Sequence, residues 1–61
     1  MFELDQLYGG YVVRQKISEN KYRYVTSCRN GIYRFSLDYL YAKRYTPATA
    51  RKHCDILNER S

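Results

Sequence analysis

The segment GYVVRQKISENKYRYVTSCRNGIYRFSL, residues 10–37, sets the architecture that we predict for this chain. It contains three runs rich in Tyr, Val and Ile, separated by short polar segments, a pattern typical of antiparallel strands joined by tight turns. Asn30-Gly31 is a strong hairpin signal, because both residues tolerate the positive φ of a type I′ turn. Ser18-Glu19-Asn20 also consists of turn-forming residues. The sequence therefore predicts a three-stranded antiparallel meander with strands at residues 10–17, 21–28 and 32–37.

The two turns also predict a register for the sheet. A two-residue turn at Asn30-Gly31 pairs Arg29 with Ile32, Cys28 with Tyr33, Thr26 with Phe35 and Tyr24 with Leu37. If Glu19-Asn20 closes the first hairpin in the same way, Ile17 lies opposite Tyr22, Gln15 opposite Tyr24, Val13 opposite Thr26 and Tyr11 opposite Cys28. Because side chains alternate between the two faces of a sheet, we expect the core face to consist of Tyr11, Val13, Ile17, Tyr22, Tyr24, Cys28, Tyr33, Phe35 and Leu37.

A helix is expected at the C-terminal end, over residues 46–59. Thr46 is a suitable N-cap and Pro47 suits the first helical position. Ala50, Cys54 and Leu57 follow at helical spacing, and they form the apolar stripe that would cover the sheet. The predicted fold is therefore α+β, a three-stranded antiparallel meander packed on one helix in the order βββα.

The remaining segments are less clearly patterned. Residues 38–45, DYLYAKRY, are expected to connect sheet and helix, with Leu40 and Tyr41 as anchors and a short helical turn. Residues 1–9 have apolar side chains at positions 2, 4 and 7, which suits either a helical turn or an extended arm. We therefore treat residues 1–61 as a single domain and leave the structure of its first nine residues open.

Composition narrows the function classes. A chain of 61 residues buries only about 60% of the surface that its unfolded form exposes, which argues against a large enclosed active site. Hydrophobic residues at 44% and aromatic residues at 16% favour a packed domain over a disordered one. The chain has no apolar run of membrane-spanning length and no signal-like start, so we expect a cytoplasmic protein without a membrane partner. Eleven Lys and Arg against six Asp and Glu, a net charge of +5, favour an acidic partner.

The predicted register gathers basic side chains on the face of the sheet opposite the core. Like charges that are close on a sheet repel by a few tenths of a kcal/mol per pair. Bound phosphates would relieve this repulsion and release counterions, and arginine can also read guanine edges in the major groove. We therefore predict a nucleic-acid-binding surface made of Arg14, Lys16, Lys21, Arg23, Arg29 and Arg34, with Lys43 at its border. The alternative is an ordinary solvated face.

Apolar and aromatic residues are the candidates for other partner contacts. Val12, Val25 and Ile32 are interleaved with the arginines on the predicted outer face, which suits a contact surface better than open water. Four tyrosines fall outside the strand pattern, at positions 8, 39, 41 and 45. Tyr39, Tyr41 and Tyr45 are accordingly predicted as candidates for base stacking or for contact with a protein, although some of these rings are expected to clamp the connecting segment onto the core.

Two stretches resemble known families. RQKISENKYRYV as a first hairpin and YTPATARKHCDILNE as a closing helix are similar to the arm-type DNA-binding domains of phage and transposon tyrosine recombinases. That resemblance implies a sheet lying in the major groove, with Arg14, Lys16, Arg23 and Arg34 facing it. The stretch AKRYTPATA…LN also resembles segments of short phage and prophage orphan proteins.

These observations lead to two hypotheses. The first is a small accessory or regulatory protein of phage or mobile-element type that binds duplex DNA, as a monomer or small homodimer. The second is a protein-binding inhibitor of a host enzyme or defence complex, which would present the same face, or an exposed sheet edge, to an acidic surface of the host protein.

Catalytic and metal chemistry find little support in the sequence. Cys28 and Cys54 fall on predicted inward positions, so we expect small core residues rather than nucleophiles. Together with His53 they lack the paired spacing of a zinc site, and a disulfide between them is disfavoured in the cytosol. No inward pair of carboxylates and no phosphate-binding glycine loop is evident. We expect no enzyme activity, no cofactor and no metal.

Overall fold

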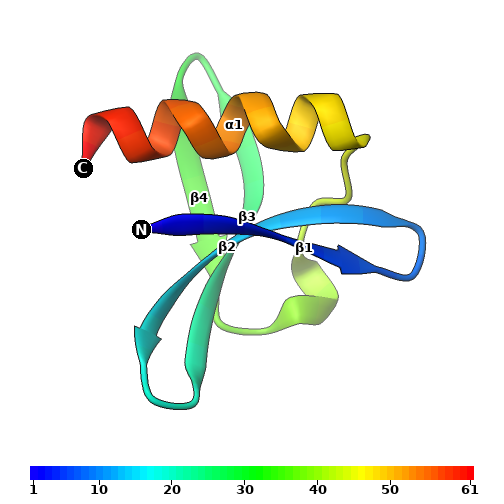
Figure 1. Cartoon of the computed structure of the whole chain (residues 1–61), viewed down its shortest axis with the longest axis vertical. Helices are drawn as coiled ribbons and strands as arrows, with labels where there is room; N and C mark the ends of the chain where they lie inside the picture. Colours follow the sequence, from blue (N-terminus) through cyan, green and yellow to red (C-terminus); the bar gives the residue numbers. More distant parts are fainter.

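The computed structural model describes residues 1–61 and has an α+β fold, an antiparallel sheet of four strands and one C-terminal helix (Figure 1). The α+β class and the closing helix are confirmed, but the sheet has one strand more than we predicted. The strands lie side by side in chain order. The elements are β1 (Phe2–Leu7), β2 (Gly10–Ser18), β3 (Lys21–Arg29), β4 (Ile32–Ser36), the short 3₁₀ helix η1 (Tyr39–Tyr41) and α1 (Pro47–Arg60).

The additional strand is β1, in the segment that the sequence left open. It pairs antiparallel with β2 from Phe2 opposite Gln15 to Leu7 opposite Gly10. Its side chains alternate, so that Phe2 and Leu4 pack in the core under α1 while Glu3 lies on the other face. The apolar positions 2 and 4 therefore follow strand periodicity.

The hairpin of β2 and β3 contains an irregularity that changes the predicted register. Ser18 lies opposite Lys21, as the turn at Glu19-Asn20 predicts, but the next pair is Lys16 opposite Tyr22. Ile17 is therefore the extra residue of a β-bulge, which shifts all later pairs by one. Because a shift by one exchanges the two faces of a strand, Tyr22 and Tyr24 lie on the outer face and not in the core.

The hairpin of β3 and β4 confirms the predicted turn. Asn30 and Gly31 have φ values of 52° and 77°, and the pairs Arg29–Ile32 and Cys28–Tyr33 are as expected. A second bulge lies between Val25 and Ser27, so that Phe35 is opposite Val25 and not Thr26. Beyond this bulge Tyr24 pairs with Ser36, so the predicted pair of Tyr24 with Leu37 is also wrong.

The core lies between α1 and the sheet. Its buried residues are Phe2, Val13, Val25, Ala50, Cys54 and Leu57, and Leu4, Tyr11, Tyr33, Phe35 and Tyr45 pack against them. The predicted helical stripe and N-cap are confirmed, since Thr46 accepts a hydrogen bond from the backbone N–H of Thr49. Two residues that we expected in the core are exposed instead, Ile17 by 47% and Leu37 by 63%. Ile17 is exposed because it forms the bulge, and Leu37 because it lies beyond the end of β4.

The connecting segment closes the gap between β2 and β3. Strand β2 bends, so that the β1–β2 hairpin crosses the β3–β4 hairpin at a wide angle (Figure 1). Tyr45 exchanges two backbone hydrogen bonds with Tyr11, and the backbone N–H of Lys43 donates to the carbonyl of Val25. The short helical turn is present as η1, but Leu40 and Tyr41 are exposed, and the buried residue of this segment is Ala42. The one α-helix has 14 residues, and it is neither long nor apolar enough to cross a membrane.

Candidate functional site

The basic residues predicted to share one face are divided between both faces of the sheet. Arg14, Lys16 and Arg34 lie on the face away from α1, as expected from the register. Arg23 lies on the helix side, where its guanidinium carbon is 4.1 Å from the Phe35 ring centre and its Nε donates to Gln15. The bulge at Ile17 is the physical reason for this correction, because it inverts the direction of β3 side chains relative to β2.

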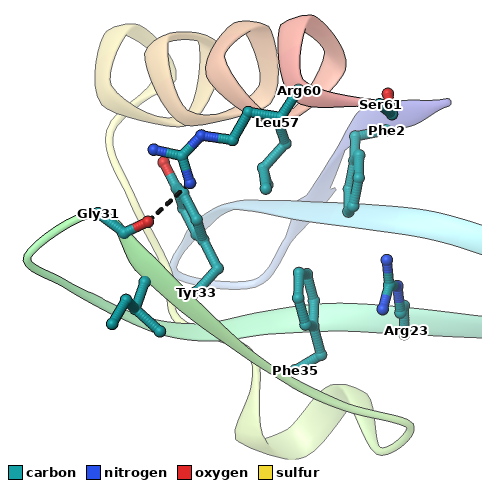
Figure 2. A pocket seen from close by; sticks show the side chains of 9 residues that line it. Phe2, Arg23, Gly31, Tyr33, Phe35, Leu57, Arg60 and Ser61 are labelled. Carbon is teal, nitrogen blue, oxygen red and sulfur yellow. Dashed lines mark hydrogen bonds between the residues drawn. The ribbon is translucent and has the colours of Figure 1, made fainter.

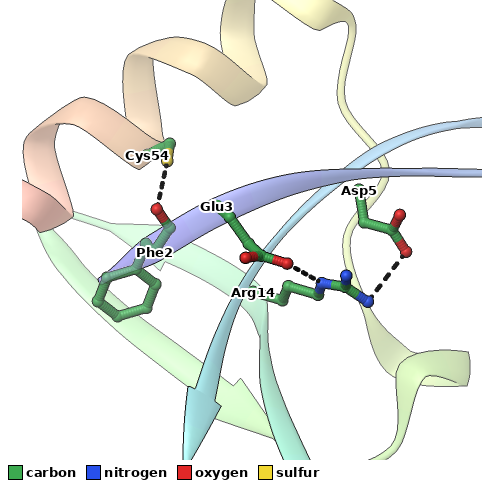
Figure 3. Close-up of polar contacts among 5 residues, drawn as sticks. All are labelled: Phe2, Glu3, Asp5, Arg14 and Cys54. Atoms are coloured by element: carbon green, nitrogen blue, oxygen red, sulfur yellow. Dashed lines mark hydrogen bonds and ion pairs between the residues drawn. The ribbon is translucent and has the colours of Figure 1, made fainter.

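Arg14 is neutralised within the chain. Its Nε donates to Glu3 at 2.7 Å and its terminal nitrogen donates to Asp5 at 3.2 Å (Figure 3). The guanidinium also lies 4.0 Å above the ring of Tyr22. Burial by itself would lower the pKa of Arg14, but the bond to Glu3 and the charge of Asp5 raise it overall. The two carboxylates of β1 therefore cancel much of the positive charge that we predicted for this face.

Two of the apolar contact candidates are inaccessible. Val12 and Val25 are both 0% exposed. Val25 packs in the core under α1 because the bulge turns it inward. Val12 lies on the outer face, next to Tyr11, whose backbone is paired with Tyr45 of the connecting segment. The placement of both valines on a contact surface is therefore wrong.

The other contact candidates differ in exposure. Ile32, Tyr39 and Tyr41 are exposed and remain available to a partner. Tyr45 is half-buried, and its ring centre is 4.8 Å from that of His53, which lies in the middle of α1. Tyr45 is therefore one of the rings that clamp the connecting segment onto the core.

Two hollows flank the β3–β4 hairpin. The first, which we call the arginine groove, is an open cavity of about 440 Å³ near the C-terminal end of α1 (Figure 2). It is lined by Phe2, Arg23, Gly31, Ile32, Tyr33, Phe35, Leu57, Arg60 and Ser61. The second, which we call the polar hollow, has about 320 Å³ and is lined by Thr26, Ser27, Cys28, Arg29, Lys43, Tyr45 and His53. Cations line both, and neither has an Asp or Glu in its wall.

Positive charge is concentrated around these hollows. The hairpin of β3 and β4 includes Lys21, Arg23, Arg29 and Arg34, and no acidic residue occurs from position 20 to position 37. The only ion pairs of the chain are the two made by Arg14. Arg29 and Lys43 are exposed at the polar hollow and have no carboxylate partner. The charge of these two side chains is thus free to act on a ligand.

The titratable groups between the hollows are held in their neutral forms. The hydroxyl of Tyr33 and Nδ1 of His53 are hydrogen-bonded at 2.7 Å. Burial, and then a hydrogen bond with Cys28, raise the pKa of Tyr33 to about 12. Burial, together with the nearby charge of Lys52, lowers the pKa of His53. At neutral pH the polar hollow therefore owes its positive charge to Arg29 and Lys43.

The two thiols have structural surroundings. Cys54 is buried, and its Sγ donates to the carbonyl of Phe2 at 3.3 Å, while burial raises the pKa of the thiol. Cys28 is half-buried at the polar hollow, and both cysteines are free. No three His, Cys, Asp or Glu side chains come together in a way that could hold a metal ion.

Sequence reasoning missed the contribution of Arg60 and gave Lys43 only a border position. Arg60 is three residues after the core residue Leu57, so it lies near the apolar stripe of the helix, and this spacing was the available signal. Its terminal nitrogen donates to the carbonyl of Gly31 at 2.7 Å. Lys43 reaches the polar hollow because its backbone N–H donates a hydrogen bond to the carbonyl of Val25. No local sequence pattern indicates this long-range contact.

No protein-family model matches the chain, and comparisons with curated proteins and with solved structures find no similar protein.

Proposed function

We propose that this chain is a small regulatory protein of phage or mobile-element type that binds duplex DNA through the β3–β4 hairpin and the polar hollow, without enzyme activity. The observation that supports this proposal best is the acid-free, cationic hairpin, flanked by Arg29 and Lys43, which have no carboxylate partner. We further propose that it acts in the cytoplasm.

The shape of the hairpin agrees with this role. A two-stranded β-ribbon fits the major groove of B-DNA, and the β3–β4 turn reaches past α1 in the view of Figure 1. Arg29 lies at the base of that turn and Lys43 on the adjacent segment. The hydroxyls of Thr26 and Ser27 in the same wall are typical donors to phosphate oxygens. The proposed interface thus lies on the hairpin, whereas Arg14 is already paired within the chain.

Titration of a fluorescently labelled duplex over a range of salt concentrations tests this proposal. Each lost phosphate contact should reduce the slope of log K against log salt by about 0.9. We expect Lys43→Gln and Arg29→Gln each to reduce the slope by about that amount and to weaken binding severalfold at about 0.1 M salt.

Arg51→Gln is the matched control, because it removes one exposed, unpaired charge from α1 at a residue that lines neither hollow. It should change affinity much less. An absence of binding even at about 25 mM salt would exclude the DNA proposal, and an equal effect of all three substitutions would show that only net charge matters.

The second candidate function is inhibition of a host enzyme or defence complex by protein binding. A specific observation favours it: β4 is an edge strand, with β3 as its only neighbour in the sheet. Edge strands offer unpaired backbone groups to another chain. If duplex DNA does not bind at low salt, this candidate becomes the leading one.

A further inference from the structure

The outer edge of β4 has no partner within the molecule. All of its ladder pairs are with β3, and no other backbone or side-chain hydrogen bond reaches the backbone of Ile32–Ser36. A two-residue hairpin closes on a hydrogen-bonded pair, which here is Arg29 and Ile32, and such pairs alternate along the ladder. Tyr33 and Phe35 therefore direct their backbone N–H and C=O groups to the free edge.

The side chains of the same two residues form part of the arginine groove. In Figure 2, Phe2, Phe35 and Leu57 lie in the middle of the groove, between Tyr33 with Arg60 on one side and Arg23 on the other. The rings of Phe2 and Phe35 stack with centres 5.9 Å apart. Edge and groove thus form one continuous surface, in which backbone groups adjoin an apolar depression.

Both cations of the groove have hydrogen-bonding capacity left. A guanidinium has five N–H donors. The Nε of Arg23 donates to Gln15, and one terminal nitrogen of Arg60 donates to Gly31. Neither arginine forms an ion pair. Each guanidinium can therefore donate hydrogen bonds to a carboxylate of a ligand and still keep its bond to Gln15 or to Gly31.

The same contacts and charges disfavour two other ligands at this surface, a nucleic-acid base and a second copy of the chain. The guanidinium of Arg23 lies over Phe35, which also stacks with Phe2, and that of Arg60 is 5.6 Å from the Tyr33 ring centre, so a base that stacked on these rings would compete with these contacts. A second copy pairing through β4 would bring two cationic hairpins together, each with Lys21, Arg23, Arg29 and Arg34 and no acid. Like charges across such an interface repel.

We propose that the β4 edge and the arginine groove bind an extended, acidic peptide segment of a partner protein. The segment adds to the sheet as a fifth strand beside β4. An apolar side chain enters the groove between Phe2, Phe35 and Leu57, and carboxylates two residues before and after it pair with Arg23 and Arg60, because alternate side chains of a strand share a face. The arginine groove shares no lining residue with the polar hollow, although both lie on the β3–β4 hairpin, so the inference does not depend on DNA binding.

Backbone amide shifts of the ¹⁵N-labelled protein, measured by NMR during titration with short peptides, test the proposal. The probe is acetyl-TETLTET-amide, in which two glutamates flank a leucine at alternate positions. We expect shift changes confined to β4 and to residues around the groove. Two control peptides each lack one feature: acetyl-TKTLTKT-amide lacks the acidic side chains, and acetyl-TETSTET-amide lacks the apolar side chain. Each should bind at least about tenfold more weakly than the probe.

Variants separate this site from the DNA site. Arg23→Gln and Arg60→Gln should each weaken peptide binding about tenfold, the loss expected for one charged hydrogen-bonded pair. Lys43→Gln should leave peptide binding unchanged. The amide spectrum of each variant shows whether it is folded, and the peptide comparison on the unmodified protein tests the proposal without any variant.

Three outcomes would overturn the inference. Shift changes away from β4, or equal binding of the acidic and basic peptides, would exclude the acidic segment. Shift changes at β4 on addition of duplex DNA, with none on addition of the acidic peptide, would assign the edge to nucleic acid. Concentration-dependent shifts at β4 without any peptide would assign it to a second copy.

Discussion

Arg14 and Arg23 lie on opposite faces of the sheet, and of the two only Arg14 has its charge neutralised inside the molecule. Arg14 binds the carboxylates of Glu3 and Asp5, whereas Arg23 lies over the ring of Phe35. The nearest neighbours of each arginine come from other strands, so its role depends on register. This is why sequence patterns identified the basic residues but not the ones that remain free.

His53 should make the stability of the domain depend on pH. Its pKa is lowered from 6.5 because burial disfavours the charged ring and Lys52 repels it. Between that lowered pKa and about 6.5, the unfolded chain binds a proton that the folded chain does not. This contribution to stability is therefore full above about pH 6.5 and is lost as the pH falls through the pKa of the folded state.

We expect the free energy of unfolding, measured by urea titration, to decrease from pH 7.5 to pH 5.5. His53→Asn keeps an acceptor near the Tyr33 hydroxyl, which His53 contacts at 2.7 Å, but it removes the titrating ring. The variant should show a flatter pH dependence in this range. An unchanged slope in His53→Asn would assign the effect to other groups.

At the scale of elements, the two turns were predictable and the two bulges were not. Asn30-Gly31 has the positive φ values that its residue types favour, and the first pairs beyond it are as predicted. The bulges at Ile17 and Thr26 depend on how β2 bends to pair with both β1 and β3. That bend is a property of the whole sheet, since bulges increase local twist where a strand must turn.

The bulges also explain how much of the candidate site the sequence could indicate. Arg29, Lys43 and the exposed Ile32 lie near turns or connections, so their exposure did not depend on register. Val25 and Arg23 lie between the two bulges, where each one-residue shift exchanges the faces. The predictions for these two residues therefore failed, although their strand was correctly located.

The contact between the connecting segment and β2 leads to a prediction for Gly10. Its φ is 148°, and an added Cβ would lie 3.1 Å from the carbonyl oxygen of Tyr45 and 3.2 Å from Cβ of Arg44. We expect Gly10→Ala to weaken the two hydrogen bonds between Tyr11 and Tyr45 and to destabilise the domain by about 1–3 kcal/mol. Urea unfolding and hydrogen exchange of the amides of Tyr11 and Tyr45 measure both effects.

Gly31→Ala is the comparison for that variant. Gly31 also has positive φ, at 77°, but the nearest atom to its added Cβ is the end of the Arg60 side chain at 3.4 Å. This substitution should cost about 1–2 kcal/mol through turn strain alone and leave exchange at Tyr45 unaffected. Equal exchange at Tyr45 in both glycine variants would show that Gly10 does not hold the connecting segment in place.

For the molecule as a whole, the first strand joins the sheet to the helix. Phe2 is 5% exposed, its backbone N–H donates to Oδ1 of Asn58 at 2.7 Å, and its carbonyl accepts from Asn58 at 3.1 Å and from Cys54. The two ends of the chain are therefore held together, and β1 is part of the core rather than an arm. Only eight residues are buried in all, so the loss of one large core side chain affects a large share of the stability.

This gives a prediction for Phe2→Ala. A 61-residue domain is stable by about 3–9 kcal/mol at typical values per residue, and removal of a buried phenylalanine side chain costs about 3–5 kcal/mol. We expect the variant to lose about 3–5 kcal/mol of its free energy of unfolding, half or more of a stability in the middle of that range, as measured by circular dichroism and urea titration. Tyr8→Ala is the control, because Tyr8 is 98% exposed in the neighbouring turn and should change stability by less than about 0.5 kcal/mol. A Phe2→Ala protein that loses less than about 1 kcal/mol would show that β1 can detach without unfolding the rest, and the four-stranded sheet would then not be the cooperative unit.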